Sequence, residues 1–330
     1  MKRSISRLQA LGLSLLALTA AALPAAAQTY PTRNITLIVP FAAGGPSDAI
    51  ARLLGQSMSA TLKGQIVIEN VAGAGGTAGA ARVAKAEPDG HTLLIAHVAL
   101  PAAASLYKSL PYDTLRDFEP LGLVNYGPMV LTTKKDLPVA NAGDLFARLK
   151  SGTATTLAHA GIGSNAHLCG LLLQQALGAK VTEVAYRGTG PAMNDLVGGQ
   201  VDALCDQSTN AVPQVQGNTI KAYGVTSKAR LDVIASVPTM QEAGLPDFEF
   251  VIWHGLYAPK GTPQDVVKTL NQALQVALDD DTIKARFAGV GTQVFGPSER
   301  SPQAHQERFR KEVATWKEVI NKLGVQKQAE

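Results

Sequence analysis

Two glycine-rich turns near the start of the chain carry residues that could bind an anion. The first lies in VPFAAGGPSDAIARLL, residues 39–54, where an apolar strand pattern at residues 35–41 passes through a double glycine into a helical pattern. We predict that Ser47 or Asp48 caps this helix. Backbone N–H groups at a helix N-terminus, together with the partial positive charge of the helix dipole, bind an anion without a cationic side chain.

The second turn, GAGGT at residues 73–77, repeats this arrangement between a strand pattern at residues 66–70 and a helical pattern at residues 77–86. Neither turn contains the Lys of a Walker loop. The second turn fits G-x-G-x-x-A, but a dinucleotide site also needs an acidic residue at the end of the next strand, where His97 and Val98 stand. We therefore expect a small anionic ligand and no nucleotide or other cofactor.

The arrangement of Ser and His residues does not favour catalysis. GIGSN at residues 161–165 lacks the closing Gly of a G-x-S-x-G nucleophile elbow. The six His residues show neither H-x-H nor H-x-x-x-H spacing, so we expect no metal site. An exported hydrolase acting on a carboxylate-bearing substrate is the alternative to a binding protein.

The first 27 residues have the features of a secretory signal peptide: a basic start, an apolar stretch at residues 11–23, and Ala25-Ala26-Ala27 as a cleavage site. We predict cleavage after Ala27 and an exported protein. The chain has 30 basic and 26 acidic residues, and three of the basic ones fall in this segment, so the remainder is nearly neutral. It has no basic stripe with interleaved aromatic residues, which argues against a nucleic-acid partner.

Cys169 and Cys205 are the two cysteines of the chain. Export places them in an oxidising compartment, and they could pair if the fold brought their Cα atoms within about 6 Å. We expect two buried free thiols.

Strand patterns alternate with helical ones along most of the chain, which predicts βαβ units and an α/β fold with mostly parallel sheets. Two long extended passages interrupt the alternation: residues 118–139, which we expect to break at Gly127-Pro128, and residues 248–263. They suggest two crossing strands that form a hinge between an outer domain, residues 28–125 and 251–330, and an inserted domain, residues 126–250. The amphipathic stretch at residues 299–323 predicts a helix that packs back on the outer domain.

The chain resembles the Bug family, the periplasmic receptors of tripartite tricarboxylate transporters. The resemblance rests on six motifs in the same order: PFAAGGPSDAIAR, ENVAGAGGTAGAARVAKAEPDGHTLL, SLPYDTLRDFEPL, GIGSNAHL, YRGTGPAMNDLVGGQVD and LYAPKGTP. It implies a two-domain periplasmic-binding-protein, or Venus flytrap, fold that closes on a small carboxylate and delivers it to a membrane permease. A periplasmic monomer is expected.

The resemblance also implies which residues contact the ligand. The first domain would bind a carboxylate through the backbone of the two glycine loops, and the second domain would close over it. The expected contacts are Phe41, Ala42, Gly45, Ser47, Gly75, Gly76 and Thr77 from the first domain, with Gly163, Ser164, Asn165, Arg187 and Asp206 from the second. His97, at the start of HVALPAAASLY, is a further candidate in the first domain. Asp48 is expected to pair with Arg52 rather than to meet the ligand.

Three of these assignments leave alternatives open. Arg187 could hold a carboxylate with its planar fork or lie on the surface paired with Asp195 or Glu183. Asp206 could accept from a ligand or cap the following helix, and His97 could donate to a second carboxylate or be structural. Apolar residues at Ala102–104 and Leu171, where relatives often carry Asn and Glu, favour an aromatic carboxylate or a dicarboxylate over an amino acid.

Overall fold

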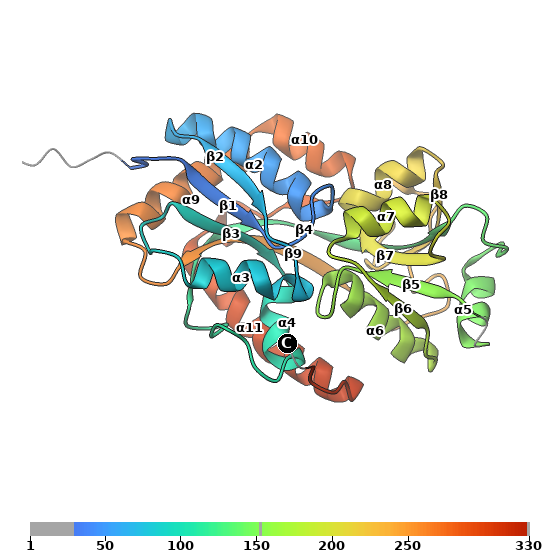
Figure 1. The fold of residues 1–330 in the computed structure, drawn as a ribbon. Helices are drawn as coiled ribbons and strands as arrows, with labels where there is room; N and C mark the ends of the chain where they lie inside the picture. Colours follow the sequence, from blue (N-terminus) through green and yellow to red (C-terminus); the bar gives the residue numbers. More distant parts are fainter. Residues whose placement is uncertain (1–29, 152–153, 329–330) are drawn as a thin grey trace, which may run out of the picture.

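The structure, a computed structural model, describes residues 30–151 and 154–328. These residues form two α/β lobes that share one mixed sheet of ten strands (Figure 1). The predicted signal peptide, residues 1–27, lies outside the described residues. Within them, no helix has the length and apolar character needed to cross a bilayer.

The first lobe is a sheet covered by helices on both faces. Helices α2, α9 and α10 pack on one face, and α3, α4 and α11 on the other (Figure 1). Its strands are β2 (Ile66–Asn70), β1 (Ile35–Val39), β3 (Thr92–His97), β9 (Val251–Pro259), the first part of β4 (Phe118–Lys134) and β10 (Gln293–Val294). Its helices are α2 (Pro46–Leu62), α3 (Thr77–Ala84), α4 (Ala99–Leu106), α9 (Gln264–Asp279), α10 (Asp281–Gly289) and α11 (Pro302–Leu323).

The second lobe repeats this layering. Helices α7 and α8 pack on one face of its strands, and α5 and α6 on the other. Its strands are β7 (Ala203–Gln207), β5 (Thr156–His159), β6 (Thr182–Ala185) and β8 (Ile220–Val225), next to the second part of β4. Its helices are α5 (Ala142–Lys150), α6 (Asn165–Leu177), α7 (Thr189–Val197) and α8 (Ser208–Gln216). Strands β1 to β3 and β5 to β7 pair in parallel, as βαβ units require.

Strand β4 connects the two lobes without a break, so the interruption expected at Gly127-Pro128 is wrong. The strand pairs antiparallel with β9 as far as Pro128, opposite Val251, and with β7 and β8 from there on. Pro128 therefore sits where the strand changes partners, a position at which its missing N–H costs little. The domain boundaries predicted after residues 125 and 250 stay a prediction, close to this exchange.

Helix α2 begins differently from the sequence prediction. Gly45 is its N-cap and no side chain caps it, because Pro46 favours the first helical position and places Ser47 inside the first turn. The Asp48 carboxylate reaches back and accepts the N–H of Gly44 at 3.1 Å. The expectation that Ser47 or Asp48 is the N-cap is therefore wrong.

Cys169 and Cys205 form a disulfide, so the expectation of free thiols is also wrong. Cys169 lies on α6 and Cys205 on β7, with their Cα atoms 6.2 Å apart. The intervening β6–α7 unit returns the chain to the strand on which α6 packs. This packing brings together two residues separated by 36 positions.

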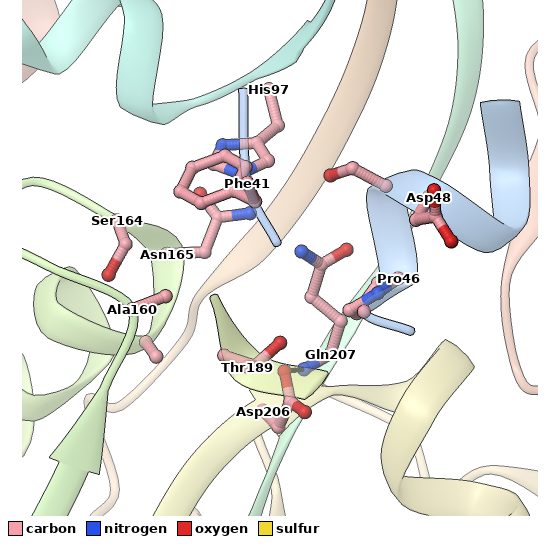
Figure 2. Close-up of a pocket in the computed structure, with 13 residues that line it drawn as sticks. Phe41, Pro46, Asp48, His97, Ala160, Ser164, Asn165, Thr189, Asp206 and Gln207 are labelled. Carbon is pink, nitrogen blue, oxygen red and sulfur yellow. Dashed lines mark hydrogen bonds between the residues drawn. The ribbon is translucent and has the colours of Figure 1, made fainter. Parts of the chain in front are cut away.

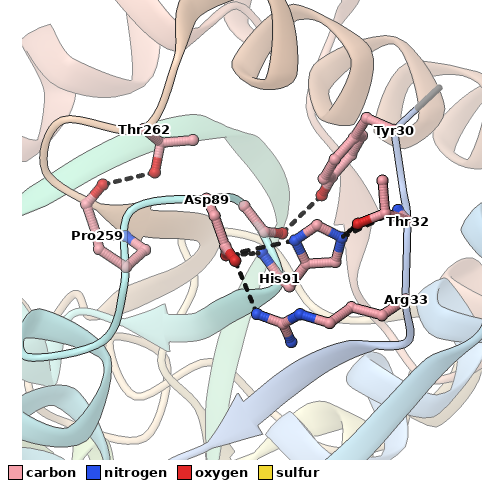
Figure 3. A network of polar contacts seen from close by, with 8 residues as sticks. Tyr30, Thr32, Arg33, Asp89, His91, Pro259 and Thr262 are labelled. Carbon is pink, nitrogen blue, oxygen red and sulfur yellow. Dashed lines mark hydrogen bonds and ion pairs between the residues drawn. The ribbon is translucent and has the colours of Figure 1, made fainter. Parts of the chain in front are cut away.

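The first described residues are fastened to the loop before β3 (Figure 3). Tyr30 donates to the carbonyl of Gly90 at 2.6 Å, and Arg33 forms an ion pair with Asp89 at 2.7 Å. Asp89 also accepts the backbone N–H of His91 at 2.9 Å. The chain thus enters β1 from a fixed position in the first lobe.

The C-terminal helix α11 packs back on the first lobe, as predicted. Phe309, Trp316 and Ile320 are buried on one side of it, and it contacts α4 and β4. The structure adds His305 to this face, fully buried, with Nδ1 accepting the N–H of Gly122 at 3.2 Å.

Candidate functional site

The first glycine loop places the start of α2 at the boundary between the lobes. Phe41 follows β1, and Ser47 in the first turn of α2 lies 3.2 Å from Nε2 of His254. The Asp48 carboxylate receives two hydrogen bonds of 3.0 Å from Arg52 and one from Asn70. Burial opposes ionisation of Asp48, but these hydrogen bonds outweigh it and lower its pKa. The expected pairing of Asp48 with Arg52 is confirmed, and its charge is largely neutralised.

The second glycine loop forms a short 3-10 turn, η1 (Ala74–Gly76), that leads directly into α3. Gly75 and Gly76 have φ values of 62° and 105°, a region that disfavours residues with a Cβ. The hydroxyl of Tyr107 lies 2.9 Å from the carbonyl oxygen of Ala74 and 2.9 Å from that of Ile162, in the second lobe. This tyrosine therefore ties the loop to the opposite lobe.

Three segments of the second lobe face these loops. Ser164 caps α6 by accepting the N–H of His167, and Asn165 is the first residue of that helix. Thr189 begins α7, and Asp206 and Gln207 end β7 immediately before α8. Each residue therefore stands at a strand end or a helix start, where a parallel sheet with flanking helices presents its ligand-binding edge.

One cavity, with about 320 Å³ of space, lies between the lobes, and a second, with about 270 Å³, lies beside it within the first lobe. Phe41 and His97 line both. The first cavity also contacts Gly45, Pro46, Ser47, Asp48, Ala160, Ser164, Asn165, Ala166, Thr189, Asp206 and Gln207 (Figure 2). The second is lined in addition by Pro40, Gly75, Gly76, Thr77, Ala80, Leu94, Ala96, Ala99, Leu100, Ala103 and Tyr112.

The stacked rings of Phe41 and His97, with centroids 4.9 Å apart, form the wall that the cavities share. Burial lowers the pKa of His97 well below its ordinary value, and neighbouring His254 adds to the effect. His97 is therefore neutral. Its Nδ1 accepts the N–H of Ala99 at 3.1 Å, which leaves the proton on Nε2 and makes the free side of the ring a hydrogen-bond donor.

Helix starts surround both cavities. α2, α6 and α7 begin at residues lining the first cavity, which also contacts Gln207, the N-cap of α8, and α3 and α4 begin at residues lining the second. Among the described residues that line the cavities there is no Lys or Arg. An anion bound here would therefore be balanced by backbone N–H groups and helix dipoles rather than by a cationic side chain in the lining.

Asp206 is fully buried beside the first cavity. Burial raises its pKa to about 6, although hydrogen bonds from Asn210, Gln207 and Thr189 oppose the rise. Its oxygens accept from the N–H of Gln207 at 2.8 Å and from Nδ2 of Asn210 at 2.5 Å. The carboxylate therefore contacts the start of α8, although Gln207 and not Asp206 is the N-cap of that helix, and acceptance from a ligand stays a prediction.

Most of the predicted site residues meet at these cavities. Ten of the thirteen line one or both: Phe41, Gly45, Ser47, Gly75, Gly76, Thr77, His97, Ser164, Asn165 and Asp206. Ala42, Gly163 and Arg187 do not. Ala42 donates its N–H to the Arg187 carbonyl at 3.0 Å, and the N–H of Gly163 donates to Nδ1 of His167.

The Arg187 side chain is exposed, and neither of its expected ion-pair partners contacts it: Asp195 accepts from Tyr186, and Glu183 from Gln174. A surface pair with Asp195 or Glu183 is therefore wrong. The carboxylate-binding role of its guanidinium stays a prediction.

Sequence reasoning missed Gln207, Thr189 and the apolar lining of the second cavity. Gln207 directly follows Asp206, and Thr189 stands two residues after Arg187, so both missed residues are close in sequence to predicted ones. Of the apolar residues taken as a hint to the ligand, Ala103 lines the second cavity, whereas Leu171 lies away from both, in a surface depression beside the end of α11.

The pattern of the family described as "tripartite tricarboxylate transporter family receptor" matches residues 50–325. The chain belongs to this receptor family. A UPF0065 protein from the TAR-I ttuE-ttuC' intergenic region of Agrobacterium vitis is 47% identical over 311 residues, covering 93% of this chain and 90% of the relative. Because the family consists of receptors, this membership favours a binding protein over the exported hydrolase that was the alternative.

Solved structures of related receptors have the same fold. The periplasmic binding protein BugD superposes with a TM-score of 0.88 at 44% identity, over 91% of this chain and all of that one. MatC from Rhodopseudomonas palustris, solved with bound malate, has a TM-score of 0.84 at 40% identity, over 88% of this chain and all of MatC. This Bug-family receptor therefore has the two-domain periplasmic-binding-protein fold.

Proposed function

We propose that this receptor works in the periplasm, closes its lobes on a small dicarboxylate and delivers it to the permease of a tripartite tricarboxylate transporter. One observation carries the proposal: six helices begin at two adjoining cavities without a Lys or Arg in their lining. Backbone donors and dipoles balance the charge of a carboxylate, and such a site can release its ligand again.

The paired cavities favour a dicarboxylate over an aromatic carboxylate, the other class that the sequence suggests. Helix starts border each cavity, and the two adjoin at Phe41 and His97, which line both. A short chain can place one carboxylate in each, past the Phe41–His97 wall. The malate bound to MatC, a dicarboxylate, is consistent with this choice.

Calorimetry and thermal melting with a ligand panel test the proposal. The panel contains succinate, glutarate, adipate, benzoate, terephthalate and glutamine. A ligand at 100 times its dissociation constant adds about 2.7 kcal/mol to the free energy of unfolding, so the melting temperature rises measurably. We expect a rise with at least one aliphatic dicarboxylate and a smaller one with benzoate. A response confined to benzoate and terephthalate would show that the ligand is an aromatic carboxylate. No response to any acid of the panel would reject the proposal that the ligand is a small carboxylate.

Export and delivery have separate tests. The N-terminal sequence of protein from the periplasmic fraction should begin at Gln28, since the predicted cleavage follows Ala27. In a host that takes up the identified ligand through a tripartite tricarboxylate transporter, deleting the gene that encodes this chain should abolish uptake of that ligand. Uptake that persists would mean that this receptor does not deliver the ligand to that permease.

A further inference from the structure

Asn165 has an unused side-chain amide at the first cavity. The residue is only 2% exposed, and neither Nδ2 nor Oδ1 has a hydrogen-bond partner among the described residues. Rotating the amide by half a turn exchanges the two atoms and still leaves one donor and one acceptor unused. Figure 2 shows its side chain extending from the start of α6 toward Phe41 and His97, at the wall of the cavity.

Gln207 reaches toward the same space. Its side chain is 5% exposed, lines the first cavity and leaves Oε1 without a partner. In Figure 2 its amide points up between Asn165 and the start of α2. The second lobe thus presents two side-chain amides to this cavity, with both polar atoms of Asn165 and the oxygen of Gln207 unpaired.

Unpaired acceptors constrain the chemistry of the ligand. A buried polar atom without a partner costs about 1 to 3 kcal/mol, so a bound ligand is expected to supply what these amides lack. An ionised carboxylate only accepts hydrogen bonds. It can satisfy Nδ2 of Asn165 and Nε2–H of His97, but it leaves Oδ1 of Asn165 unpaired.

We propose that the ligand carries a hydroxyl group next to the carboxylate that enters the first cavity, and that this hydroxyl donates to Oδ1 of Asn165. The inference rests on the proposed function and narrows its ligand class to hydroxydicarboxylates. Gln207 Oε1 is the second acceptor within the cavity for the same group.

An ammonium group is the other donor that a small carboxylate can carry, and the charges of the site disfavour it. The two carboxylates lining the cavity are already engaged: Asp48 by Arg52 and Asn70, and Asp206 by Gln207 and Asn210. A buried ammonium would have to share Asp206 with the donors of Gln207 and Asn210 or meet neutral amide oxygens, and charges are buried at low cost only when paired. A hydroxyl needs no counter-charge.

Matched ligands that differ at one substituent test the inference. We would measure by calorimetry the affinities for succinate, malate and aspartate, and for glutarate, 2-hydroxyglutarate and glutamate, using both enantiomers of each chiral acid. We expect one enantiomer of the hydroxy acid to bind at least about tenfold more tightly than the unsubstituted acid of equal length, and the amino acid to bind more weakly than the hydroxy acid.

The variant Asn165→Leu removes both amide atoms at similar side-chain volume. We expect the preference for the hydroxy acid over the unsubstituted acid to fall to about twofold or less, while exposed Asn194→Leu on α7 keeps the wild-type preference. Thermal melting of the free proteins checks that both variants fold. If Asn165→Leu does not fold, Asn165→Asp, which keeps acceptors and loses the donor, should retain the hydroxyl preference while binding every acid more weakly.

Each outcome bears on one proposal. Equal affinity for hydroxy and unsubstituted acids, or tightest binding of the amino acids, overturns the hydroxyl inference and leaves the dicarboxylate receptor standing. An unchanged preference in Asn165→Leu overturns the role of Asn165. Binding of none of the acids by a folded protein overturns the proposed function, and the inference with it.

Discussion

The backbone N–H of Ala42 in the first lobe donates a 3.0 Å hydrogen bond to the carbonyl oxygen of Arg187 in the second lobe. Two glycines make this approach possible. A Cβ at Gly188 would lie 2.9 Å from the nitrogen of Ala42, and one at Gly190 would lie 2.7 Å from the carbonyl oxygen of Ala43. The lobes therefore meet backbone to backbone, in contacts that involve no ligand atom.

The variant Gly190→Ala should hold the lobes apart. Gly190 lies in the first turn of α7, where Ala is a good helix residue, and the three atoms nearest to an added Cβ all belong to the first lobe. We expect a larger radius of gyration at saturating ligand. Because the closed form becomes a minor state, ligand affinity should fall about tenfold or more. Small-angle scattering and calorimetry measure the two effects.

Gly289→Ala provides the matched control. Gly289 is the last residue of α10, and a Cβ there meets nothing within 4 Å. This variant should bind and close as the wild type does. Wild-type affinity and compaction in Gly190→Ala would contradict the backbone contact between the lobes in solution.

Much of the architecture could be predicted from the sequence because it depends on local signals. β2 matches the predicted residues 66–70, since turn residues flank an apolar run of strand length. The glycine loops stood out because a strand, a glycine turn and a helix follow one another directly. The family motifs then extended the site to the second lobe.

What the sequence missed depends on contacts between distant segments. Whether Pro128 breaks a strand depends on which strands lie beside it, and β4 changes partners at that residue. The pairing of Cys169 with Cys205 depends on the packing of α6 against β7. Gln207 belongs to the cavity only because the two lobes meet in front of it.

Removing the disulfide should destabilise the protein while leaving it folded. The bond closes a loop of 36 residues, for which the loss of chain entropy in the unfolded state corresponds to about 4 kcal/mol. We expect the double variant Cys169→Ala/Cys205→Ala to lose about 2 to 4 kcal/mol of unfolding free energy, measured by urea denaturation. Dithiothreitol should shift the wild-type transition and leave that of the double variant in place. Two reactive thiols in the unfolded, unreduced wild type would contradict the bond.

Arg187→Ala tests the role of an exposed guanidinium. The side chain lines neither cavity, and its carbonyl rather than its charge contacts the first lobe. We expect calorimetry to show a loss of binding free energy below about 0.5 kcal/mol, typical of exposed charges. A loss of about 2 to 5 kcal/mol, with partial recovery in Arg187→Lys, would instead support bidentate binding of the ligand carboxylate.

Asp206 predicts how stability changes with pH. Its pKa is raised from 3.8 to about 6 in the folded protein because burial disfavours the charged form. Between these two values the folded state keeps a proton that the unfolded state has released, so this residue makes the free energy of unfolding fall as pH rises from about 4 through about 6.

In Asp206→Asn the side chain does not titrate, and Asn210 can turn its amide oxygen toward the new donor. Urea denaturation of both proteins from pH 4 to pH 7 isolates the contribution, because the other groups titrate in both. We expect the stability of the wild type minus that of the variant to decrease through about pH 6 and to flatten toward pH 7. A difference that stays constant, or that grows with pH, would contradict the raised pKa and mean that Asp206 is ionised in the folded protein throughout this range.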